Sequence, residues 1–222
     1  VTGTDTGVGK TLVSQVMLHQ LRADYRRVAG FKPVASGCDS TPDGLRNADA
    51  VALQHAGSMN LPYDVVNPYA FAAPVAPHLA AQRAGVIIDC SAIVRGIVAV
   101  RADCVVVEGV GGWLVPLNDQ QTTADLAQML ALPVMLVVGL RLGCLNHALL
   151  TAEAIRARGL EIAGWIANQI DPQFELGDEN VAALEQRLQA PLTMRLPYFP
   201  DQQLLKGVAA SYRTTPSATP KL

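Results

Sequence analysis

Two patterns of apolar and polar residues alternate along the chain. In residues 10–24, KTLVSQVMLHQLRAD, the apolar positions Val13, Val16 and Leu21 lie on one stripe of a helix. The run CVVV at 104–107 is instead apolar throughout, as is typical of a strand buried on both faces of a parallel sheet. The same patterns predict further helices near 50–54, 78–84, 89–101, 122–131, 143–159 and 179–188, and further strands near 26–32, 133–139, 161–168 and 192–196.

This alternation of strand and helix predicts an α/β fold, with a mostly parallel sheet covered by helices on both faces. The length of 222 residues and the hydrophobic content of 50% fit a single domain that spans residues 1–222. Ligands of such sheets bind beyond the carboxyl ends of the strands. We therefore expect one rim to gather the segments that follow predicted strands, namely 4–11, 32–36, 108–112, 139–146 and Asn168.

Three segments depart from the regular pattern. Residues 57–77 contain four prolines and are expected to be irregular. The tail from about residue 211 is polar and is expected to be frayed. Only Val1 and Thr2 precede the first loop, so we expect the first strand to be incomplete in this chain.

Composition and charge narrow the choice of partners. The net charge is -2 and the sequence pI is about 6.1, so no basic surface points to nucleic acid. No apolar run approaches the roughly 18 residues of a membrane helix, and no secretory leader is apparent. The four cysteines lack the spacing of a zinc or redox motif and are expected to be reduced thiols of a cytoplasmic protein.

The stretch VTGTDTGVGKT, residues 1–11, ends like a phosphate-binding loop. The usual spacing is Gly, four residues, then Gly-Lys-Ser/Thr, but here Thr4 stands where glycine is expected. Backbone N–H groups from Gly7 to Thr11 should wrap phosphate oxygens at the start of the helix. Lys10 should reach the terminal phosphates and Thr11 should offer its hydroxyl to Mg²⁺, which predicts a fold like that of P-loop NTPases.

Other residues on the predicted rim are ambiguous when taken singly. Glu108 closes an apolar strand, where a carboxylate ligand of Mg²⁺ commonly sits, whereas Asp49 within a helix would read as a surface charge. A lone strand-end lysine such as Lys32 is more often a solvated charge, and Ser36 fits an ordinary loop residue. The free N–H groups at the helix start 144–146 favour an anion, or water could satisfy them.

No Ser-His-Asp set, Cys-His pair or zinc signature emerges from the sequence. A site that works by positioning and electrostatics suits phosphoryl transfer.

Seven strings of the sequence resemble dethiobiotin synthetase, in the same order. The resemblance covers nearly the whole chain, thins after about residue 200, and includes the extra residue ahead of Gly-Lys-Thr. The strings are GTDTGVGKT, FKPVASG, TPDGLRNADA, VNPYAF, VVVEGVGGW, LPVMLVVGLRLGCLNHALLTA and GWIAN.

The resemblance implies an activity in biotin biosynthesis. 7,8-Diaminopelargonic acid, carbon dioxide and MgATP would give dethiobiotin, ADP and phosphate, through a carbamate and a carbamic-phosphoric anhydride. The enzyme would be a homodimer with its site at the interface, where the helix start of one subunit holds the substrate carboxylate of the other.

The resemblance also implies roles for individual residues. Lys10 and Lys32 would neutralise phosphate and carbamate charge, with Lys32 as the catalytic lysine. The Mg²⁺ ligands would be Thr11, Asp49 and Glu108; the substrate contacts Thr6, Lys32, Ser36, Cys144, Leu145 and Asn146; and the nucleotide contacts Gly7, Val8, Gly9, Lys10, Thr11, Asp49, Glu108, Gly109, Val110 and Gly111, with Asn168, Pro197, Tyr198 and Phe199 at the adenine.

One departure and two alternatives accompany this interpretation. Gly7 stands where a well-known relative has a glutamate, so altered Mg²⁺ or ATP affinity is expected. Amide-forming synthetases acting on cobyrinic acids normally carry a glutamine-hydrolysing domain, for which this chain has neither the length nor a Cys-His site. Partitioning ATPases usually have a second lysine early in the loop, where Thr4, Asp5 and Thr6 stand here.

Overall fold

The computed structural model describes residues 1–199 and contains a parallel sheet. Strands β1 (Thr2–Gly3), β8 (Val134–Leu140), β9 (Ile162–Gln169) and β10 (Leu192–Leu196) pair side by side in that order, all parallel. A second parallel pair joins β2 (Val28–Phe31) to β7 (Cys104–Val107). Val1 connects the two groups, because its nitrogen donates to the Val107 carbonyl at 2.7 Å and its carbonyl accepts from the Gly109 nitrogen at 3.0 Å.

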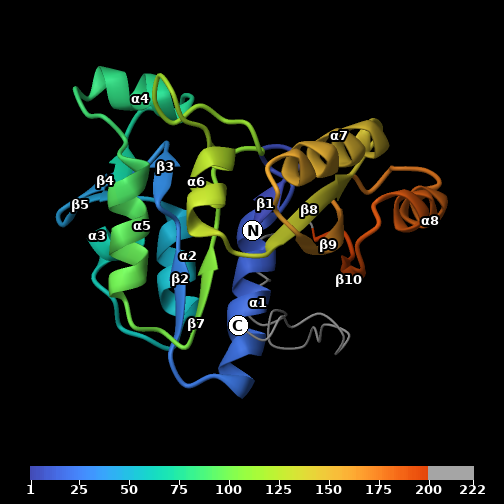
Figure 1. The fold of residues 1–222 in the computed structure, drawn as a ribbon, viewed down its shortest axis with the longest axis horizontal. Coiled ribbons are helices and arrows are strands. Elements are labelled where there is room, and N and C mark those ends of the chain that lie inside the picture. The colour runs from blue at the N-terminus through green and yellow to red at the C-terminus, as the bar shows by residue number, and fades with distance from the viewer. Residues whose placement is uncertain (200–222) are drawn as a thin grey trace.

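Helices cover both faces of this sheet (Figure 1). Their bounds are α1 (Lys10–Asp24), α2 (Ala48–Ala56), α3 (Tyr63–Val66), α4 (Pro77–Arg83), α5 (Cys90–Ala99), α6 (Thr123–Leu130), α7 (Cys144–Ala157) and α8 (Gly177–Arg187). The predicted α/β class, the strands and the main helices are confirmed, with ends that differ by a few residues. Burial on both faces holds for β8 but not for β7, where only Val106 is buried, because β7 lines a hollow.

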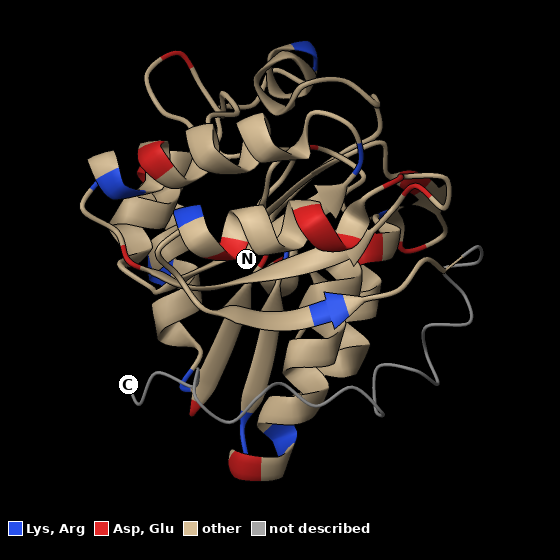
Figure 2. Cartoon of the chain, turned by 90° about the vertical axis from the view of Figure 1, so that its right-hand side faces the viewer, with Lys and Arg blue, Asp and Glu red and all other residues tan. Residues whose placement is uncertain are grey.

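Strand β8 shows why the apolar runs lie inside the molecule. Successive side chains of a strand point to opposite faces. Leu136 and Val138 therefore enter the core beneath α7 and α8, while Met135 and Val137 enter the core beneath α1. Burial on both faces requires an apolar residue at every position, and the charged residues accordingly lie mainly on helices and loops (Figure 2).

The expectation of irregular structure at 57–77 is wrong in part. This segment contains α3 and the strand β6 (Tyr69–Phe71), which pairs in parallel with β3 (Val34–Ser36). The polar stretch before α2 likewise forms a hairpin of β4 (Asp39–Thr41) and β5 (Gly44–Arg46). Strand β6 depends on hydrogen bonds to a segment about 35 positions away, and the other elements are only three or four residues long, so local periodicity does not reveal them.

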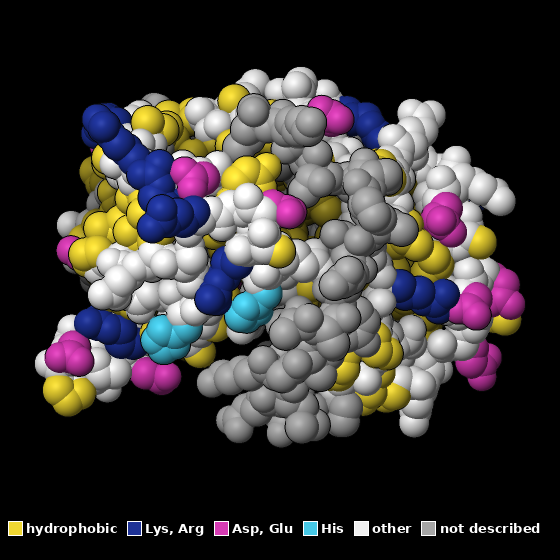
Figure 3. All heavy atoms as spheres, turned by 90° about the horizontal axis from the view of Figure 1, so that it is seen from below, with side chains coloured by type: hydrophobic (Ala, Val, Ile, Leu, Met, Phe, Trp, Pro, Cys, Tyr) yellow, Lys and Arg dark blue, Asp and Glu magenta, His cyan; other side chains and the backbone are white. Residues whose placement is uncertain are grey.

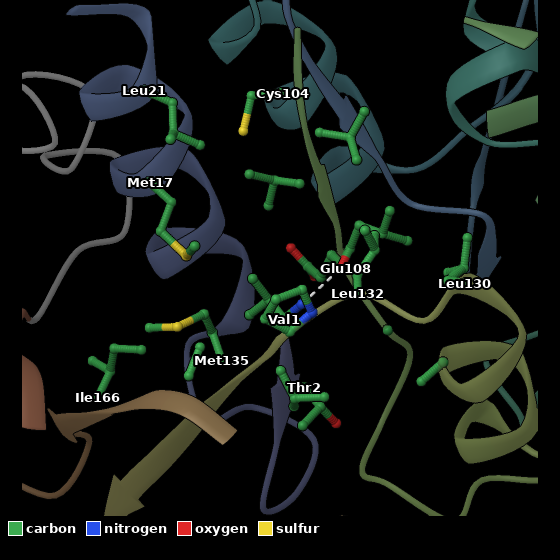
Figure 4. Close-up of a pocket in the computed structure, with 18 of the residues that line it drawn as sticks. Val1, Thr2, Met17, Leu21, Cys104, Glu108, Leu130, Leu132, Met135 and Ile166 are labelled. Carbon is green, nitrogen blue, oxygen red and sulfur yellow. Dashed lines mark hydrogen bonds between the residues drawn. The ribbon is translucent and has the colours of Figure 1, made fainter. Parts of the chain in front are cut away.

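A hollow of about 1200 Å³ lies between β7 and β8, bordered by α1 and α6 (Figure 4). Its lining is mostly apolar and includes Met17, Leu21, Cys104 and Met135, with Glu108 at its margin. A small-molecule site needs a few convergent polar groups. These gather at the carboxyl ends of the strands, beyond Glu108.

The opposite end of the molecule, seen from below in Figure 3, carries positive and negative side chains interspersed. Among residues 1–199, no helix combines the length and the apolar character needed to cross a bilayer. The tail expected to be frayed from about 211 lies outside the described residues.

Candidate active site

The phosphate-binding loop connects β1 to α1 through two glycines with left-handed backbone. Gly7 has φ 75° and Gly9, the N-cap of α1, has φ 92°. The side chain of Asn168, at the end of β9, lies against Gly9 and donates to the Val8 carbonyl at 2.8 Å. A Cβ atom at Gly9 would stand 2.1 Å from the Asn168 nitrogen, so only glycine fits there. The first-turn amides of α1 are thereby held ready for an anion.

Lys10 lies in a buried position at the start of α1. Its Nζ donates to the Asp5 carbonyl at 2.8 Å, within the same loop. Burial, together with the nearby charge of Lys32, lowers the pKa of Lys10 to about 8. On the other side of Asp5, its carboxylate accepts from the Arg141 guanidinium at 2.5 Å. The loop is therefore tied to the end of β8 by an ion pair.

Lys32 and Glu108 meet at the ends of the adjacent strands β2 and β7. The Lys32 Nζ lies 2.5 Å from Glu108 Oε1, 3.2 Å from Asp49 Oδ2 and 3.2 Å from the Gly109 carbonyl. The Thr11 hydroxyl donates to the same Glu108 oxygen at 2.9 Å. The structure thus brings together side chains that are 97 residues apart in sequence.

The electrostatics of this cluster are those of a buried ion pair. Burial lowers the pKa of Lys32, but the charges and hydrogen bonds of Glu108 and Asp49 outweigh that effect and raise the pKa overall. Lys32 therefore keeps its proton. Asp49 is 43% exposed on its side chain, yet it is paired with Lys32, so the surface-charge interpretation is incomplete.

One carboxylate oxygen in this cluster has no partner. Glu108 Oε2 is buried and makes no hydrogen bond within residues 1–199. A buried orphaned carboxylate oxygen is costly unless something binds it. Among the described residues, no group of three or more His, Cys, Asp or Glu side chains is placed so that it could hold a metal ion by itself. Thr11, Asp49 and Glu108 instead offer two carboxylates and one hydroxyl, which fits a hard divalent ion that completes its shell with phosphate and water.

Ser36, Thr6 and Val110 lie in or after β3, β1 and β7. Ser36 ends β3 with a buried hydroxyl that has no hydrogen-bond partner among residues 1–199. Thr6 lies next to the turn after β7, since a Cβ at Gly111 would stand 3.6 Å from the Thr6 hydroxyl. Val110 is partly buried against the core beneath α5 and α6.

The start of α7 presents backbone groups more than side chains. Gly143 is its N-cap with φ 94°, and no side chain caps the helix. The Cys144 side chain is buried and its amide donates to the Arg141 carbonyl at 3.0 Å. The amides that follow, of Leu145 and Asn146, belong to the first turn, whose N–H groups have no acceptor within the helix.

The segment that follows β10 reaches back to the loop. Phe199 is partly buried against a cluster that contains Val8 and Leu12. Tyr198 is 41% exposed. Pro197 links them directly to the end of β10. The segment and Asn168 therefore both approach the loop from the β9–β10 side.

Two groups of residues were missed in the sequence. Arg141 and Asp5 pair across 136 positions. Asn67, directly after α3, donates to the Lys32 carbonyl and accepts in turn from the Tyr63 hydroxyl. The string VNPYAF contained Asn67, but nothing in it assigned a role. The signal available in the sequence was an asparagine before a proline in an otherwise apolar string.

Comparisons with known proteins show which family this chain resembles. A family model described as "AAA domain" matches residues 1–203. The chain is 55% identical over 202 residues to the ATP-dependent dethiobiotin synthetase BioD of Xanthomonas axonopodis pv. citri (strain 306), covering 90% of each chain. It is 53% identical over 205 residues to the protein of that name from Xanthomonas oryzae pv. oryzae (strain PXO99A), covering 91% of this chain and 92% of the relative. The protein of that name from Pseudomonas aeruginosa (strain UCBPP-PA14) is 52% identical over 200 residues, covering 89% of this chain and 88% of the relative.

Proposed function

This chain belongs to the ATP-dependent dethiobiotin synthetase family, and we propose that it joins carbon dioxide to both amines of 7,8-diaminopelargonic acid at the expense of MgATP. It is an enzyme of this type with a role in biotin biosynthesis. One observation carries the detailed proposal. The ammonium of Lys32, the carboxylate of Glu108 and the hydroxyl of Thr11 meet within 2.9 Å contacts beside the loop that holds Lys10.

The first step makes a carbamate. One substrate amine attacks the carbon of carbon dioxide, forms a C–N bond and releases a proton. The product carries a negative charge that a fixed cation stabilises. Lys32 supplies that cation, because its pairing with Glu108 and Asp49 keeps it protonated. Ser36 and Thr6 contact the substrate from the loops on either side.

The second step transfers the γ-phosphoryl group of ATP. A carbamate oxygen attacks phosphorus, the bond to the bridging oxygen of ADP breaks, and a carbamic-phosphoric anhydride forms. Little covalent help is needed, so catalysis comes from positioning and charge. The loop amides from Gly7 to Thr11 bind the phosphates, and Lys10 exchanges its contact with the Asp5 carbonyl for a phosphate oxygen.

The third step closes the ring. The second amine attacks the carbonyl carbon of the anhydride, loses a proton, and expels phosphate to leave the cyclic urea of dethiobiotin. The role of Lys32 here is to stabilise charge as it moves onto the leaving phosphate. The same ammonium serves all three steps because the carbamate and the phosphoryl group that it receives both lie beside Lys32.

A magnesium ion fits the residues at this site. Thr11, Asp49 and Glu108 would hold it, and the unpartnered Glu108 Oε2 is the atom that favours this assignment. When bound, the ion supplies positive charge to the phosphate oxygens during transfer. Gly109, Val110 and Gly111 line the nucleotide beside it.

Adenine recognition and subunit contacts complete the proposal. Asn168, Pro197, Tyr198 and Phe199 hold the base, in keeping with the approach of both segments to the loop. The protein acts as a cytoplasmic homodimer, in which Cys144, Leu145 and Asn146 bind the substrate carboxylate in the partner's site. Their position at a helix N-terminus suits a carboxylate.

Isotope-labelled bicarbonate tests the proposal. Purified protein is incubated with 7,8-diaminopelargonate, MgATP and ¹³C-bicarbonate, and dethiobiotin is measured by mass. We expect product that carries one heavy carbon, with phosphate release that depends on both the diamine and bicarbonate. Phosphate release stimulated by a protein partner or membrane, with no dethiobiotin, would contradict it. Omission of the diamine is the matched control.

A further inference from the structure

We infer that Tyr63 and Asn67 are positioning residues that hold the Lys32 ammonium against Asp49, an inference that rests on the proposed roles of Lys32 and Asp49. Both lie in or directly after α3, a single helical turn beside α2 and β2 (Figure 1). Their hydrogen bonds go to backbone groups and to each other, not to the side chains of Lys32 or Asp49. Their effect on those side chains passes through the backbone.

Asn67 fixes the main chain of Lys32. Lys32 follows the last residue of β2, so its backbone lies beyond the ladder with β7. The buried Asn67 Nδ2 donates to the Lys32 carbonyl at 2.6 Å, and the Lys32 nitrogen donates to the Val66 carbonyl at 3.0 Å. The end of α3 therefore supplies partners for both polar groups of the Lys32 backbone.

The Tyr63 hydroxyl joins this contact to the helix that carries Asp49. It donates to Asn67 Oδ1 at 2.9 Å and accepts from the Asn47 nitrogen at 2.7 Å. Asn47 is the N-cap of α2, and its side chain accepts from the Asp49 nitrogen at 3.1 Å. A continuous chain of hydrogen bonds thus links the two segments whose side chains meet 3.2 Å apart, Lys32 Nζ and Asp49 Oδ2.

Two further features hold this chain of hydrogen bonds in one arrangement. The Arg46 guanidinium lies 4.2 Å from the centre of the Tyr63 ring, a cation–π contact that restrains the ring. Burial raises the pKa of Tyr63, although its hydrogen bond with Asn47 and the charge of Arg46 oppose this. The phenol keeps the proton that it donates to Asn67.

The phosphate-binding loop lies outside this chain of hydrogen bonds. Lys10 is held by the Asp5 carbonyl and the loop backbone by Asn168. Removing the Tyr63 hydroxyl should therefore disturb the chemical steps that use the Lys32 ammonium more than the binding of ATP. A purely structural role of Tyr63 would lower the free energy of unfolding without lowering kcat more than ATP affinity.

The matched test compares the kinetics of the variants Tyr63→Phe and Tyr69→Phe. The Tyr69 hydroxyl also accepts from the backbone nitrogen of a helix N-cap, Asp89 at the start of α5, at 3.0 Å. Both variants lose a phenol that pairs with a cap nitrogen. Tyr63→Phe removes both hydrogen bonds of the hydroxyl. We expect it to lower kcat about tenfold, equivalent to about 1.4 kcal/mol, while the Kd for ATP changes less than about twofold. Tyr69→Phe should keep both values. An equal kcat in the two variants would overturn the inference.

Labelling of Lys32 gives a readout that does not require dethiobiotin formation. Reductive methylation with peptide mapping should modify Lys32 several-fold faster in Tyr63→Phe than in wild type or Tyr69→Phe, because its ion pairs are loosened. Equal labelling rates would overturn the inference. If the wild type makes no dethiobiotin but labelling rises in Tyr63→Phe alone, the proposed function fails and the positioning role stands.

If Tyr63→Phe does not fold, the variant Asn67→Asp tests the same inference. It retains the acceptor for Tyr63 but removes the donor to the Lys32 carbonyl. The same kcat and labelling changes are expected, and their absence counts against the inference.

Discussion

Gly9→Ala should damage the phosphate loop far more than Gly7→Ala. Both glycines have left-handed backbone, with φ 92° and 75°. A Cβ atom at Gly7 would meet nothing within 4 Å, whereas one at Gly9 would lie 2.1 Å from Asn168 Nδ2. The pair of variants therefore separates backbone strain, which both share, from displacement of Asn168, which only Gly9→Ala causes.

The two costs can be estimated separately. A left-handed alanine costs about 1–2 kcal/mol, and the loss of glycine's freedom in the unfolded chain returns about 0.4–1 kcal/mol. Gly7→Ala should thus lower the free energy of unfolding by about 1 kcal/mol. Gly9→Ala also breaks the 2.8 Å bond from Asn168 to the Val8 carbonyl in a buried place. Leaving buried polar groups unpaired adds about 1–3 kcal/mol.

Urea denaturation measures these differences, and titration calorimetry measures ATP affinity. We expect Gly9→Ala to be less stable than Gly7→Ala by about 1–3 kcal/mol, and to bind ATP at least about tenfold more weakly, since tenfold corresponds to 1.4 kcal/mol.

Asn168→Ala completes a double-mutant cycle. It removes the same hydrogen bond without crowding Gly9, so the double variant Gly9→Ala/Asn168→Ala should cost less than the two single changes added together. Equal stabilities of Gly7→Ala and Gly9→Ala, or strict additivity in the cycle, would refute the reasoning.

Three other predictions follow from the site and from α6. Lys32→Ala should reduce turnover to below about 1% because a buried cation is lost, while calorimetric ATP affinity stays within about threefold; near-normal turnover would remove Lys32 from catalysis. Gly7→Glu places a carboxylate in open space near the loop, so the Mg²⁺ dependence of kcat/KM should shift, and unchanged parameters would count against that idea. Asp125 accepts from the Thr122 nitrogen at 2.7 Å in a capping box and pairs with Arg158, so Asp125→Asn should cost about 1–2 kcal/mol in urea denaturation at pH 7. Burial raises the pKa of Asp125, but these bonds outweigh it and lower the pKa to about 2. The stability difference should therefore persist above about pH 4 and disappear as pH falls toward 2; a difference that persists at pH 2 would refute this.

The sequence by itself determined the parts of this protein that depend on local pattern. The run CVVV predicted a strand, and the stripe of Val13, Val16 and Leu21 predicted the face of a helix that packs on the core. Gly-Lys-Thr between strand and helix identified the phosphate-binding loop. The order of seven strings indicated the family, which the comparisons confirm.

Tertiary structure alone decided how these parts meet. The pattern left Asp49 as a surface charge and residues 57–77 as irregular, yet Asp49 pairs with Lys32 and α3 supplies the hydrogen bonds that hold the Lys32 backbone. Periodicity reports which face of an element is apolar, over a few residues. It contains no information about which polar groups satisfy one another across 35 or 97 positions, because that depends on where the folded chain brings them together.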